Sequence, residues 1–400
     1  MTRVHIDTFG CKLNQAETEA MRRQLAAAGY RVVDRLTGAD VLILNTCTVT
    51  HVADRKARQA VRSARKTGRD IAVVVTGCYA ERQVQAITAL PGVAAVVSMT
   101  GKADIAAEIR RLGFQPDKAL YVPELPRTRS LIKIQAGCDH HCAYCIVPTV
   151  RPVKSSVPAE AVIEEIKTRQ TEGYREIVVT GTEIGEYRDG EFDLTGLLRR
   201  IIEQTTIERI RVSSVQPREI TPALIELWRN PRLCRHFHLS LQSGSDTVLR
   251  RMRRRYDTGA YRQAVTLIRT VAPAAAITTD IIAGFPGETD GEFNESLAFI
   301  QDIGFARLHI FPFSPRPGTA AVGMPHQVEP RITQHRVQRL LETASSCETA
   351  FRQSLTGQVF EVLFEECGGG TWTGYTDNYV RITHHSTEDL GNRIVPIRLD

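Results

Sequence analysis

Short apolar runs alternate with amphipathic stretches over the first 112 residues of the chain. The amphipathic stretches have the spacing of helices, and the apolar runs have the length of strands: Val4–Phe9, Val41–Leu44, Ile71–Val75 and Val93–Val97. Strands separated by helices are typical of βαβ units, which build a parallel sheet covered on both faces. The pattern therefore predicts a doubly wound α/β domain over residues 1–114.

A second alternation follows a proline-containing segment at residues 115–129, which has no clear periodicity and is expected to be a linker. Its strand-like runs are Leu131–Gln135, Glu176–Thr180, Arg209–Ser213, His236–Leu241, Ala276–Ala283 and Ala306–Phe311. Its helical stretches are Ala159–Thr171, Leu194–Glu203, Asp246–Arg254, Gly259–Val271 and Asp290–Ile303, and a further one runs from Pro330 to about Ser354. Six β/α units fall short of the eight that close a barrel. We therefore expect an open, partial (β/α)6 barrel over residues 130–353.

The last segment, residues 354–400, has a different character. Gln358–Glu365 and Tyr379–Thr383 are strand-like and flank the glycine run Gly368–Gly370, which predicts a small all-β module. The module carries 3 basic and 7 acidic side chains, a net charge of −4, within a chain whose net charge is +6. Its aromatic side chains could stack on RNA bases, but its negative charge repels phosphate and favours a basic protein partner.

The cysteines and the apolar runs indicate in which cellular compartment the protein is located. No apolar run reaches the ~18–20 residues that span a bilayer, and residues 1–10 lack the cationic start and apolar core of a secretion signal. The 9 cysteines are an odd number whose spacing does not fit a small secreted disulfide framework. We expect a cytoplasmic protein with reduced thiols and no membrane association.

Cys138, Cys142 and Cys145 form a local triad directly after the first strand of the second series. Three thiolates in one glycine-led loop can converge on one metal centre, and thiolates suit iron–sulfur clusters and zinc. A structural zinc site usually takes a fourth ligand from a second Cys-x2-Cys pair, and no such pair is nearby. Three ligands leave one iron of a four-iron cluster open to a substrate or cofactor. Zinc binding and chance clustering remain the alternatives.

Cys11, Cys47 and Cys78 form a dispersed triad. Each lies one to three residues beyond the carboxyl end of an expected strand in the first domain. Ligands bind at that edge of open parallel sheets, so the three thiols can share one site. Gly10 and Gly77 precede two of them and allow a tight turn toward a bulky group. The alternative is three unrelated core cysteines.

The remaining cysteines have no such neighbours in the sequence. Cys234 precedes a strand, Cys347 lies in a helix-like stretch, and Cys367 precedes the glycine run. Free cysteine is often buried as a small hydrophobic residue. We expect all three to be core thiols.

These motifs resemble a known family. The Cys-x3-Cys-x2-Cys loop, with Tyr144 before its last cysteine, resembles the signature of radical S-adenosylmethionine (SAM) enzymes. Several further segments are similar to the methylthiotransferase family: Phe9-Gly-Cys-Lys-Leu-Asn-Gln, Asn45-Thr-Cys-Thr-Val-Thr, Thr76-Gly-Cys-Tyr, His238-Leu-Ser-Leu-Gln-Ser-Gly-Ser-Asp and Asp280-Ile-Ile-Ala-Gly-Phe-Pro-Gly-Glu-Thr. The end module, with Gly374-Tyr-Thr-Asp-Asn-Tyr, resembles the small β-barrel called TRAM. Phe9-Gly-Cys-Lys-Leu-Asn-Gln-Ala-Glu is most similar to the branch that modifies N6-threonylcarbamoyladenosine in tRNA.

The resemblance implies an activity and its cofactors. The enzyme would transfer a methylthio group to C2 of N6-threonylcarbamoyladenosine next to the anticodon. That C–H bond has no acidic proton, so a radical is needed, and cofactors supply such chemistry. The resemblance implies that the catalytic local triad holds a SAM-binding 4Fe–4S cluster and that the dispersed triad holds a second, sulfur-donating one. The residues expected to contact SAM are Tyr144, Gly181, Thr182, Glu183, Ser214 and Gln242.

The implied partners are tRNA and an electron donor such as flavodoxin or ferredoxin. Two basic runs, at residues 55–69 and 250–255, could bind RNA or could be solvated helix faces. Gln216 stands where glutamate is usual in the family, so no charge-dependent role is assigned to it. Two other functions stay open, namely methylthiolation of a ribosomal-protein aspartate and a non-catalytic, metal-containing scaffold that binds RNA.

Overall fold

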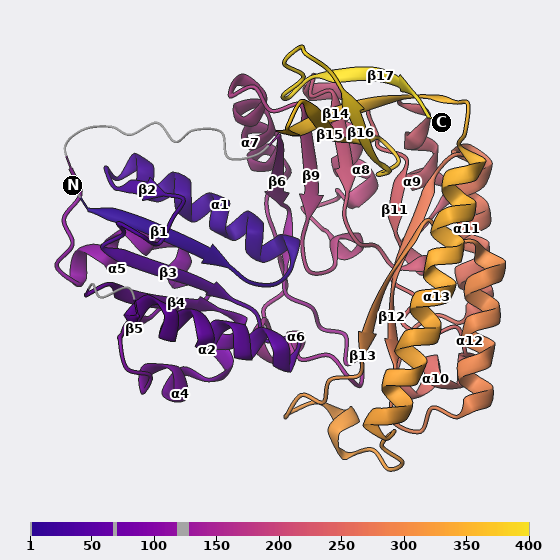
Figure 1. Ribbon diagram of the computed structural model, residues 1–400, viewed down its shortest axis with the longest axis horizontal. Coiled ribbons are helices and arrows are strands. Elements are labelled where there is room, and N and C mark those ends of the chain that lie inside the picture. The colour runs from indigo at the N-terminus through magenta and orange to yellow at the C-terminus, as the bar shows by residue number, and fades with distance from the viewer. Residues whose placement is uncertain (1, 67–69, 118–127, 400) are drawn as a thin grey trace.

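A computed structural model of the chain describes residues 2–66, 70–117 and 128–399. Its amino-terminal part is a doubly wound α/β domain, which confirms the expected fold (Figure 1). Five parallel strands lie in the order β2-β1-β3-β4-β5. The strands are β1 (Arg3–Thr8), β2 (Arg31–Val33), β3 (Val41–Thr46), β4 (Ala72–Gly77) and β5 (Val93–Val96). The helices are α1 (Lys12–Ala27), α2 (His51–Arg65), α3 (Cys78–Arg82), α4 (Val84–Thr88) and α5 (Ile105–Arg111).

Side-chain alternation along β3 shows why this sheet takes helices on both faces. Ile43 is buried with Met21 of α1, whereas its neighbour Leu42 is buried in a separate cluster with Val61 of α2. Successive residues of a strand point to opposite faces, so a continuous apolar strand needs cover on both. All parallel strands then end at one edge, from which the loops carrying Cys11 and Cys47 emerge.

The second part is a barrel of six parallel strands. The strands are β6 (Arg129–Lys133), β9 (Glu176–Thr180), β10 (Arg209–Val212), β11 (His236–His238), β12 (Ala276–Ala283) and β13 (Arg307–Pro312). They hydrogen-bond as β10-β9-β6 and β11-β12-β13, and isolated bridges such as Val215 to Leu239 join the two halves. Within the described residues β6 and β13 do not pair, so the barrel is open, as expected.

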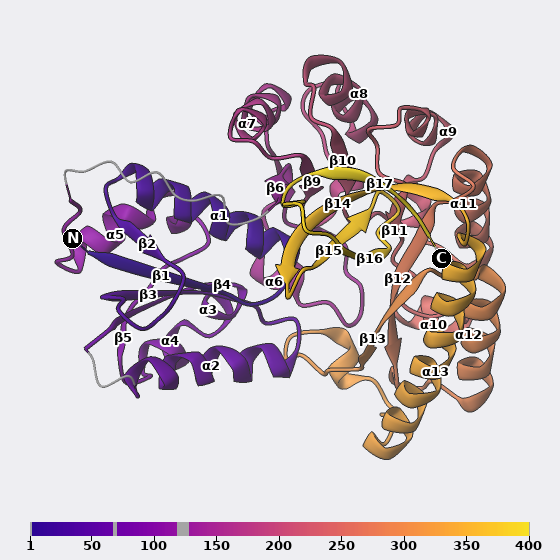
Figure 2. The ribbon, with the colours of Figure 1, turned by 45° about the horizontal axis from the view of Figure 1, so that its top comes forward.

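Helices cover the outside of this barrel (Figure 2). They are α7 (Ala159–Thr171), α8 (Leu194–Gln204), α9 (Pro222–Ile225), α10 (Asp246–Arg251), α11 (Thr258–Val271), α12 (Asp290–Ile303) and α13 (Pro330–Ser354). The loop between β6 and α7 also holds β7 (Gln135–Ala136), α6 (Val147–Val150) and β8 (Ser155–Ser156).

The end module is a curled antiparallel sheet in the order β16-β15-β14-β17, lying across the amino ends of the barrel strands (Figure 1). Its strands are β14 (Val359–Gly368), β15 (Thr371–Thr376), β16 (Arg381–His385) and β17 (Ile394–Arg398). Phe360, Val362 and Phe364 alternate inward along β14 and form its core. The sequence indicated two of these four strands.

Arginines of the barrel hold the module in place. Arg235 Nε lies 2.6 Å from Asp377 Oδ2, and Arg129 Nη2 lies 2.5 Å from Glu365 Oε1. The Arg129 guanidinium also lies 4.9 Å from the ring centre of Tyr375, and the ring of Tyr379 stacks on Tyr375 at 4.9 Å. Part of the module's negative charge is therefore neutralised within the molecule. These two tyrosines pack at the interface instead of being free to stack on bases.

Part of the expected linker lies outside the described residues, namely 118–127. Arg129, the last residue assigned to it, begins β6. Among the described residues, no helix combines the length and apolarity that membrane crossing requires.

Candidate active site

The local cysteine triad lies in the loop between β7 and α6, at the carboxyl end of the barrel strands. Cys138, Cys142 and Cys145 are each partly exposed. The fully buried side chain of Gln135 holds this loop, because its Nε2 donates to the Gly137 carbonyl at 2.7 Å. Its Oε1 accepts from the backbone N–H of Glu183 at 2.9 Å. One amide thus ties the cysteine loop to the loop that follows β9.

The expected SAM contacts after β9 lie against the cysteine loop. Thr182 accepts a hydrogen bond from the Gly137 N–H through its hydroxyl at 3.1 Å and donates its own N–H to Gln135 Oε1 at 3.1 Å. Gly181 approaches the Gln135 carbonyl so closely that an added Cβ would lie 2.6 Å from that oxygen. Only glycine fits this approach without displacing backbone.

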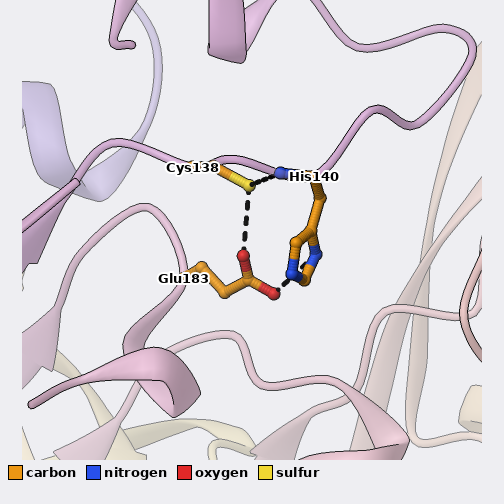
Figure 3. A group of neighbouring side chains, drawn as sticks. All are labelled: Cys138, His140 and Glu183. Atoms are coloured by element: carbon orange, nitrogen blue, oxygen red, sulfur yellow. Dashed lines mark hydrogen bonds and ion pairs between the residues drawn. The ribbon is translucent and has the colours of Figure 1, made fainter. Parts of the chain in front are cut away.

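Glu183 lies at the centre of a compact group with Cys138 and His140 (Figure 3). Cys138 Sγ donates to Glu183 Oε2 at 3.1 Å, and His140 Nδ1 lies 3.0 Å from Glu183 Oε1. Burial raises the pKa of Glu183 and lowers the pKa of His140 to about 4. The side chains are arranged around a carboxylate that the cysteine loop and the β9 loop share.

Two thiols of the local triad, Cys138 and Cys145, are held in their protonated form by their surroundings. Burial raises the pKa of Cys145 to about 11, with the neighbouring Cys142 adding to the effect. Burial also raises the pKa of Cys138, and Glu183 adds to it. Binding a metal releases these protons, since the thiolate is the ligand.

Within the described residues, the ligand atoms of Cys138, His140 and Glu183 all lie within 4.8 Å of one another. The three sulfur atoms of each cysteine triad do not lie that close together. A four-iron cluster takes one thiolate at each iron, so its ligands lie farther apart than those of a single ion. Three soft thiols per triad without a fourth cysteine fit clusters better than a closed zinc site.

Two residues beside the triad had no predicted role at this site. Arg254 Nη1 lies 3.2 Å from Cys142 Sγ, and its Nη2 donates to Gln216 Oε1 at 3.2 Å. The Gln216 Nε2 in turn donates to Glu183 Oε1. An amide at position 216 therefore serves both neighbours, since it accepts from the arginine and donates to the carboxylate.

The other expected SAM contacts surround the same space. The Tyr144 hydroxyl accepts from Arg254 Nη1 at 3.4 Å, and its ring meets Phe285 edge-on. Gln242 follows β11 with a φ of 69°, and both its backbone groups bond to β12. Ser214 follows β10 and is exposed. Ser214 and Gln242 have no side-chain hydrogen bond among the described residues.

The dispersed triad gathers at the carboxyl edge of the amino-terminal sheet. Cys47 and Cys78 are 5% and 6% exposed, and Cys11 is exposed. Burial raises the pKa of Cys47 to about 12, and the thiols of Cys11 and Cys78 raise it further. Gly10 has a φ of 109° and packs so tightly on Cys47 that an added Cβ would lie 2.5 Å from Cys47 Cβ. The tight turn expected there is present.

A buried polar network contacts the dispersed triad at Cys78. Arg151, in the loop after α6, reaches into the amino-terminal domain and donates to both oxygens of Glu17 at 2.7 and 2.9 Å. Its Nε lies 3.4 Å from Cys78 Sγ, and Lys102 Nζ lies 2.5 Å from the same Glu17 carboxylate. Although burial favours the neutral acid, Arg151 and Lys102 lower the pKa of Glu17 to about 2.

The two triads lie next to each other. Ile146, which directly follows Cys145, is buried in one cluster with Val150 and Cys78. The loop that carries the local triad thus packs on a member of the dispersed triad.

The comparisons with known proteins indicate the family of this chain. The model of a family described as "Uncharacterized protein family UPF0004" matches residues 3–98, and that of the Radical SAM superfamily matches residues 132–300. The chain is 36% identical to the threonylcarbamoyladenosine tRNA methylthiotransferase MtaB of Bacillus subtilis (strain 168), over 100% of this chain and 94% of that protein. The chain belongs to the radical SAM methylthiotransferase family. Such an enzyme uses 4Fe–4S clusters and SAM.

Two further matches give context. The methylthiotransferase is 33% identical to the tRNA-2-methylthio-N(6)-dimethylallyladenosine synthase of Symbiobacterium thermophilum, over 99% of this chain and 92% of that protein. Its fold resembles the radical SAM methyltransferase TsrM of Kitasatospora setae, solved with cobalamin and a [4Fe-4S] cluster bound. The TM-score is 0.61 at 13% identity, covering 80% of this chain and 77% of that one. The structural match shows the fold alone.

The two basic runs of the methylthiotransferase have different environments. On α2, the side chains of Arg55, Lys56, Arg62, Arg65 and Lys66 are exposed, and Arg69 lies outside the described residues. The second run is mostly engaged with the protein, because Arg251 pairs with Glu292 at 2.7 Å, Arg254 contacts the cysteine loop, and Arg255 Nη1 lies 2.9 Å from His140 Nε2. Of the two runs, as far as the structure describes them, the one on α2 keeps more of its cations exposed.

The remaining cysteines of the methylthiotransferase are not all buried. Cys234 and Cys347 are 1% and 8% exposed, as expected for core thiols. The prediction for Cys367 is wrong, because this residue is exposed on β14, opposite Trp372 of β15. Cys367 lies near the end of β14, beyond the buried Phe364, where this small sheet has little core in which to bury it.

Proposed function

We propose that this methylthiotransferase transfers a methylthio group to C2 of N6-threonylcarbamoyladenosine next to the tRNA anticodon. The observation that supports the proposal is the buried cluster of Ile146, Val150 and Cys78, which joins the loop of the local triad to a member of the dispersed triad. Both parts of the reaction, radical formation and sulfur transfer, need to reach one adenine. The similarity to tRNA-modifying relatives over the whole chain supports the substrate class.

We assign the residues as follows. Cys138, Cys142 and Cys145 would hold a 4Fe–4S cluster that leaves an open iron for SAM, and Cys11, Cys47 and Cys78 would hold the second cluster. The chemistry these groups supply when bound is one-electron cleavage of SAM and provision of the sulfur atom. Tyr144, Gly181, Thr182, Glu183, Ser214 and Gln242 would line the SAM site.

The protein's own contribution is orientation and charge. Gln135 fixes the cysteine loop against the β9 loop, and Arg254 places a permanent positive charge beside Cys142. A positive charge and N–H donors near a thiolate favour its ionised, ligating form. Apolar neighbours such as Phe285 and Ile146 exclude water from the same region.

The substrate would approach over the basic face of α2, which borders the edge where the dispersed triad lies. The negative charge of the end module repels RNA less than its sequence suggests, because Glu365 and Asp377 are paired with arginines of the barrel. We further propose a cytoplasmic location and a small one-electron donor protein, such as flavodoxin or ferredoxin. Methylthiolation of a ribosomal-protein aspartate and a non-catalytic scaffold are the rival functions.

The proposal is tested with anaerobically reconstituted enzyme. We expect about eight irons per chain, and about four after replacement of either cysteine triad by alanine. The variant lacking Cys11, Cys47 and Cys78 should still cleave SAM but transfer no methylthio group. The variant lacking Cys138, Cys142 and Cys145 should do neither, and Cys367→Ala should retain both.

The substrate is tested by mass spectrometry of tRNA from a deletion strain complemented with each of these genes. Restoration of the 2-methylthio group on N6-threonylcarbamoyladenosine by the wild type and by Cys367→Ala, and by neither triad variant, would support the assignment. Metal content without SAM cleavage would favour the scaffold. Modification of a ribosomal protein with unchanged tRNA would favour the other rival.

A further inference from the structure

A cavity of about 470 Å³ lies where three parts of the chain meet. Its wall includes Lys12 from the start of α1, Leu131, Val178 and Arg211 from the barrel strands, and Glu365 and Tyr379 from the end module. This volume falls within the ~300–1,000 Å³ typical of small-ligand pockets. The cavity is large enough for a nucleoside substituent.

The cavity adjoins the dispersed triad. Lys12 directly follows Cys11, the exposed member of that triad. Its ammonium group is also within electrostatic reach of Asp280, which lies on β12 on the far side of the barrel. The side chain of Lys12 therefore extends from the cluster edge of the amino-terminal sheet toward the barrel interior.

Lys12 differs from the other cations of this wall in having no partner. Arg129 pairs with Glu365 at 2.5 Å, and Arg211 Nε donates to the buried Glu176 at 2.7 Å. Within the described part of the chain, the side chain of Lys12 makes neither a hydrogen bond nor an ion pair. A lysine ammonium has three donors, and withdrawing it from bulk water without a partner is costly. An oxyanion in the cavity would satisfy it.

We propose that this cavity receives the N6 substituent of the substrate and that Lys12 binds its carboxylate, as a specificity-determining residue. The inference rests on the proposed function. A threonylcarbamoyl group ends in a carboxylate, whereas the dimethylallyl group named for other family members carries no charge. An ammonium–carboxylate hydrogen bond would favour the charged substituent by about ten- to a hundredfold.

An RNA phosphate is the rival ligand for the same ammonium. Arg129 neutralises Glu365, but the wall also carries the exposed carboxylate of Glu366, which repels the repeated charges of an RNA backbone. A single carboxylate on a short neutral chain can reach Lys12 while staying away from that wall. The cavity chemistry thus favours the substituent over the backbone.

The test compares three anticodon stem-loops on reconstituted holoenzyme: one with threonylcarbamoyladenosine, one with its carboxylate converted to the primary amide, and one with unmodified adenosine. Equilibrium dissociation constants are measured for the wild type, Lys12→Met and Lys12→Gln. Lys133→Met is the matched control, because this nearby lysine pairs with Glu17 and does not line the cavity. Iron content near eight per chain confirms that each variant keeps its clusters.

We expect the wild type and Lys133→Met to bind the acid about ten- to a hundredfold more tightly than the amide. Lys12→Met and Lys12→Gln should bind acid and amide equally, without weaker binding of the unmodified stem-loop. Equal binding of acid and amide by the wild type would overturn the inference without any variant. An equal loss on all three RNAs would overturn it in favour of a phosphate contact. If the wild type fails to methylthiolate the acid-bearing stem-loop, the proposed function itself fails.

Discussion

The guanidinium of Arg151 lies 3.4 Å from the sulfur of Cys78, across the boundary between the barrel and the amino-terminal domain. The same group donates to both oxygens of Glu17 and to Asn14 Oδ1 at 2.9 Å. Since Arg151, Glu17 and Lys102 are all at most 8% exposed, this network is a buried junction between domains.

Arg151→Ala should destabilise the enzyme, because it leaves Glu17 with a single buried cation. Removing one partner of a buried, hydrogen-bonded charge pair costs about 3–5 kcal/mol. Urea unfolding of the iron-free chain should show this loss, and the reconstituted variant should bind about four irons instead of about eight. Arg22→Ala is the control on α1, because Arg22 pairs with the largely exposed Asp34. Unchanged stability and iron content in Arg151→Ala would contradict the claim that Arg151 stabilises the junction between the domains.

Gln135→Ala should release the local cysteine loop. The substitution leaves the N–H groups of Thr182 and Glu183 and the carbonyl of Gly137 without their partner, and each buried unpaired group costs about 1–3 kcal/mol. SAM cleavage should fall at least about tenfold, measured as 5′-deoxyadenosine formed after reduction. Gln170→Ala, whose side chain bonds to Thr206 at the surface, should leave the rate unchanged.

Glu219 should make stability depend on pH near neutrality. Burial raises the pKa of Glu219 from 4.5 to about 7, and its Oε1 has no hydrogen-bond partner among the described residues. A raised acid pKa contributes stability below pH 4.5 that is lost as the pH rises through 7. Relative to Glu219→Gln, the wild type should lose about 2–3 kcal/mol of unfolding free energy between pH 4.5 and 8.

The measurement is urea unfolding across that pH range. Glu226→Gln, at an exposed surface pair with Arg229, should shift the free energy of unfolding by less than about 0.5 kcal/mol at every pH. A constant difference between the wild type and Glu219→Gln would show that folding does not raise the pKa of Glu219.

Charge reversal on α2 should weaken tRNA binding. The exposed Arg62 and Lys66 lie on its basic face, and each lost phosphate contact lowers the slope of log affinity against log salt by about 0.7–0.9. Filter binding of tRNA to Arg62→Glu and Lys66→Glu over a salt series checks this. Arg199→Glu, exposed on α8, is the matched control. A slope equal to that of the wild type would exclude α2 from the interface.

Much of the fold was predictable, because buried strands and amphipathic helices leave periodic apolar patterns. The expected bounds of α7 and α12 agree with the structure, and the β9 and β12 runs match as well. Helix α12 even shows its start in the sequence, since Thr289 and Glu292 form a reciprocal capping box.

Short and irregular elements were missed for physical reasons. Strand β2 has three residues, too few to show alternation, and β15 owes its place to pairing with β14. The helix expected over Asp246–Arg254 ends at Arg251, since Arg253 has a φ of 57°. A left-handed arginine has no signature in a single sequence.

The cysteines of the site could be predicted from spacing and strand ends, whereas their supporting residues could not. Gln135, Arg151 and Arg254 act through contacts that depend on how distant loops meet in space. Arg254 was instead grouped with its basic neighbours as an RNA-binding run. Gln216 is the exception, because the sequence shows an amide where the family usually has a carboxylate. An amide can donate a hydrogen bond to Glu183, whereas a carboxylate cannot.

Glu17 is synthesised well before its partner Arg151, and Asp54 well before Arg316, which donates to it from beyond β13 at 2.5 Å. In a nascent amino-terminal domain, Glu17 and Asp54 therefore have only their nearer cations, Lys102 and Arg82, before either arginine is made. A separately expressed amino-terminal fragment would keep the two nearer cations but would lack both arginines, and Cys78 would lose its contact with Arg151.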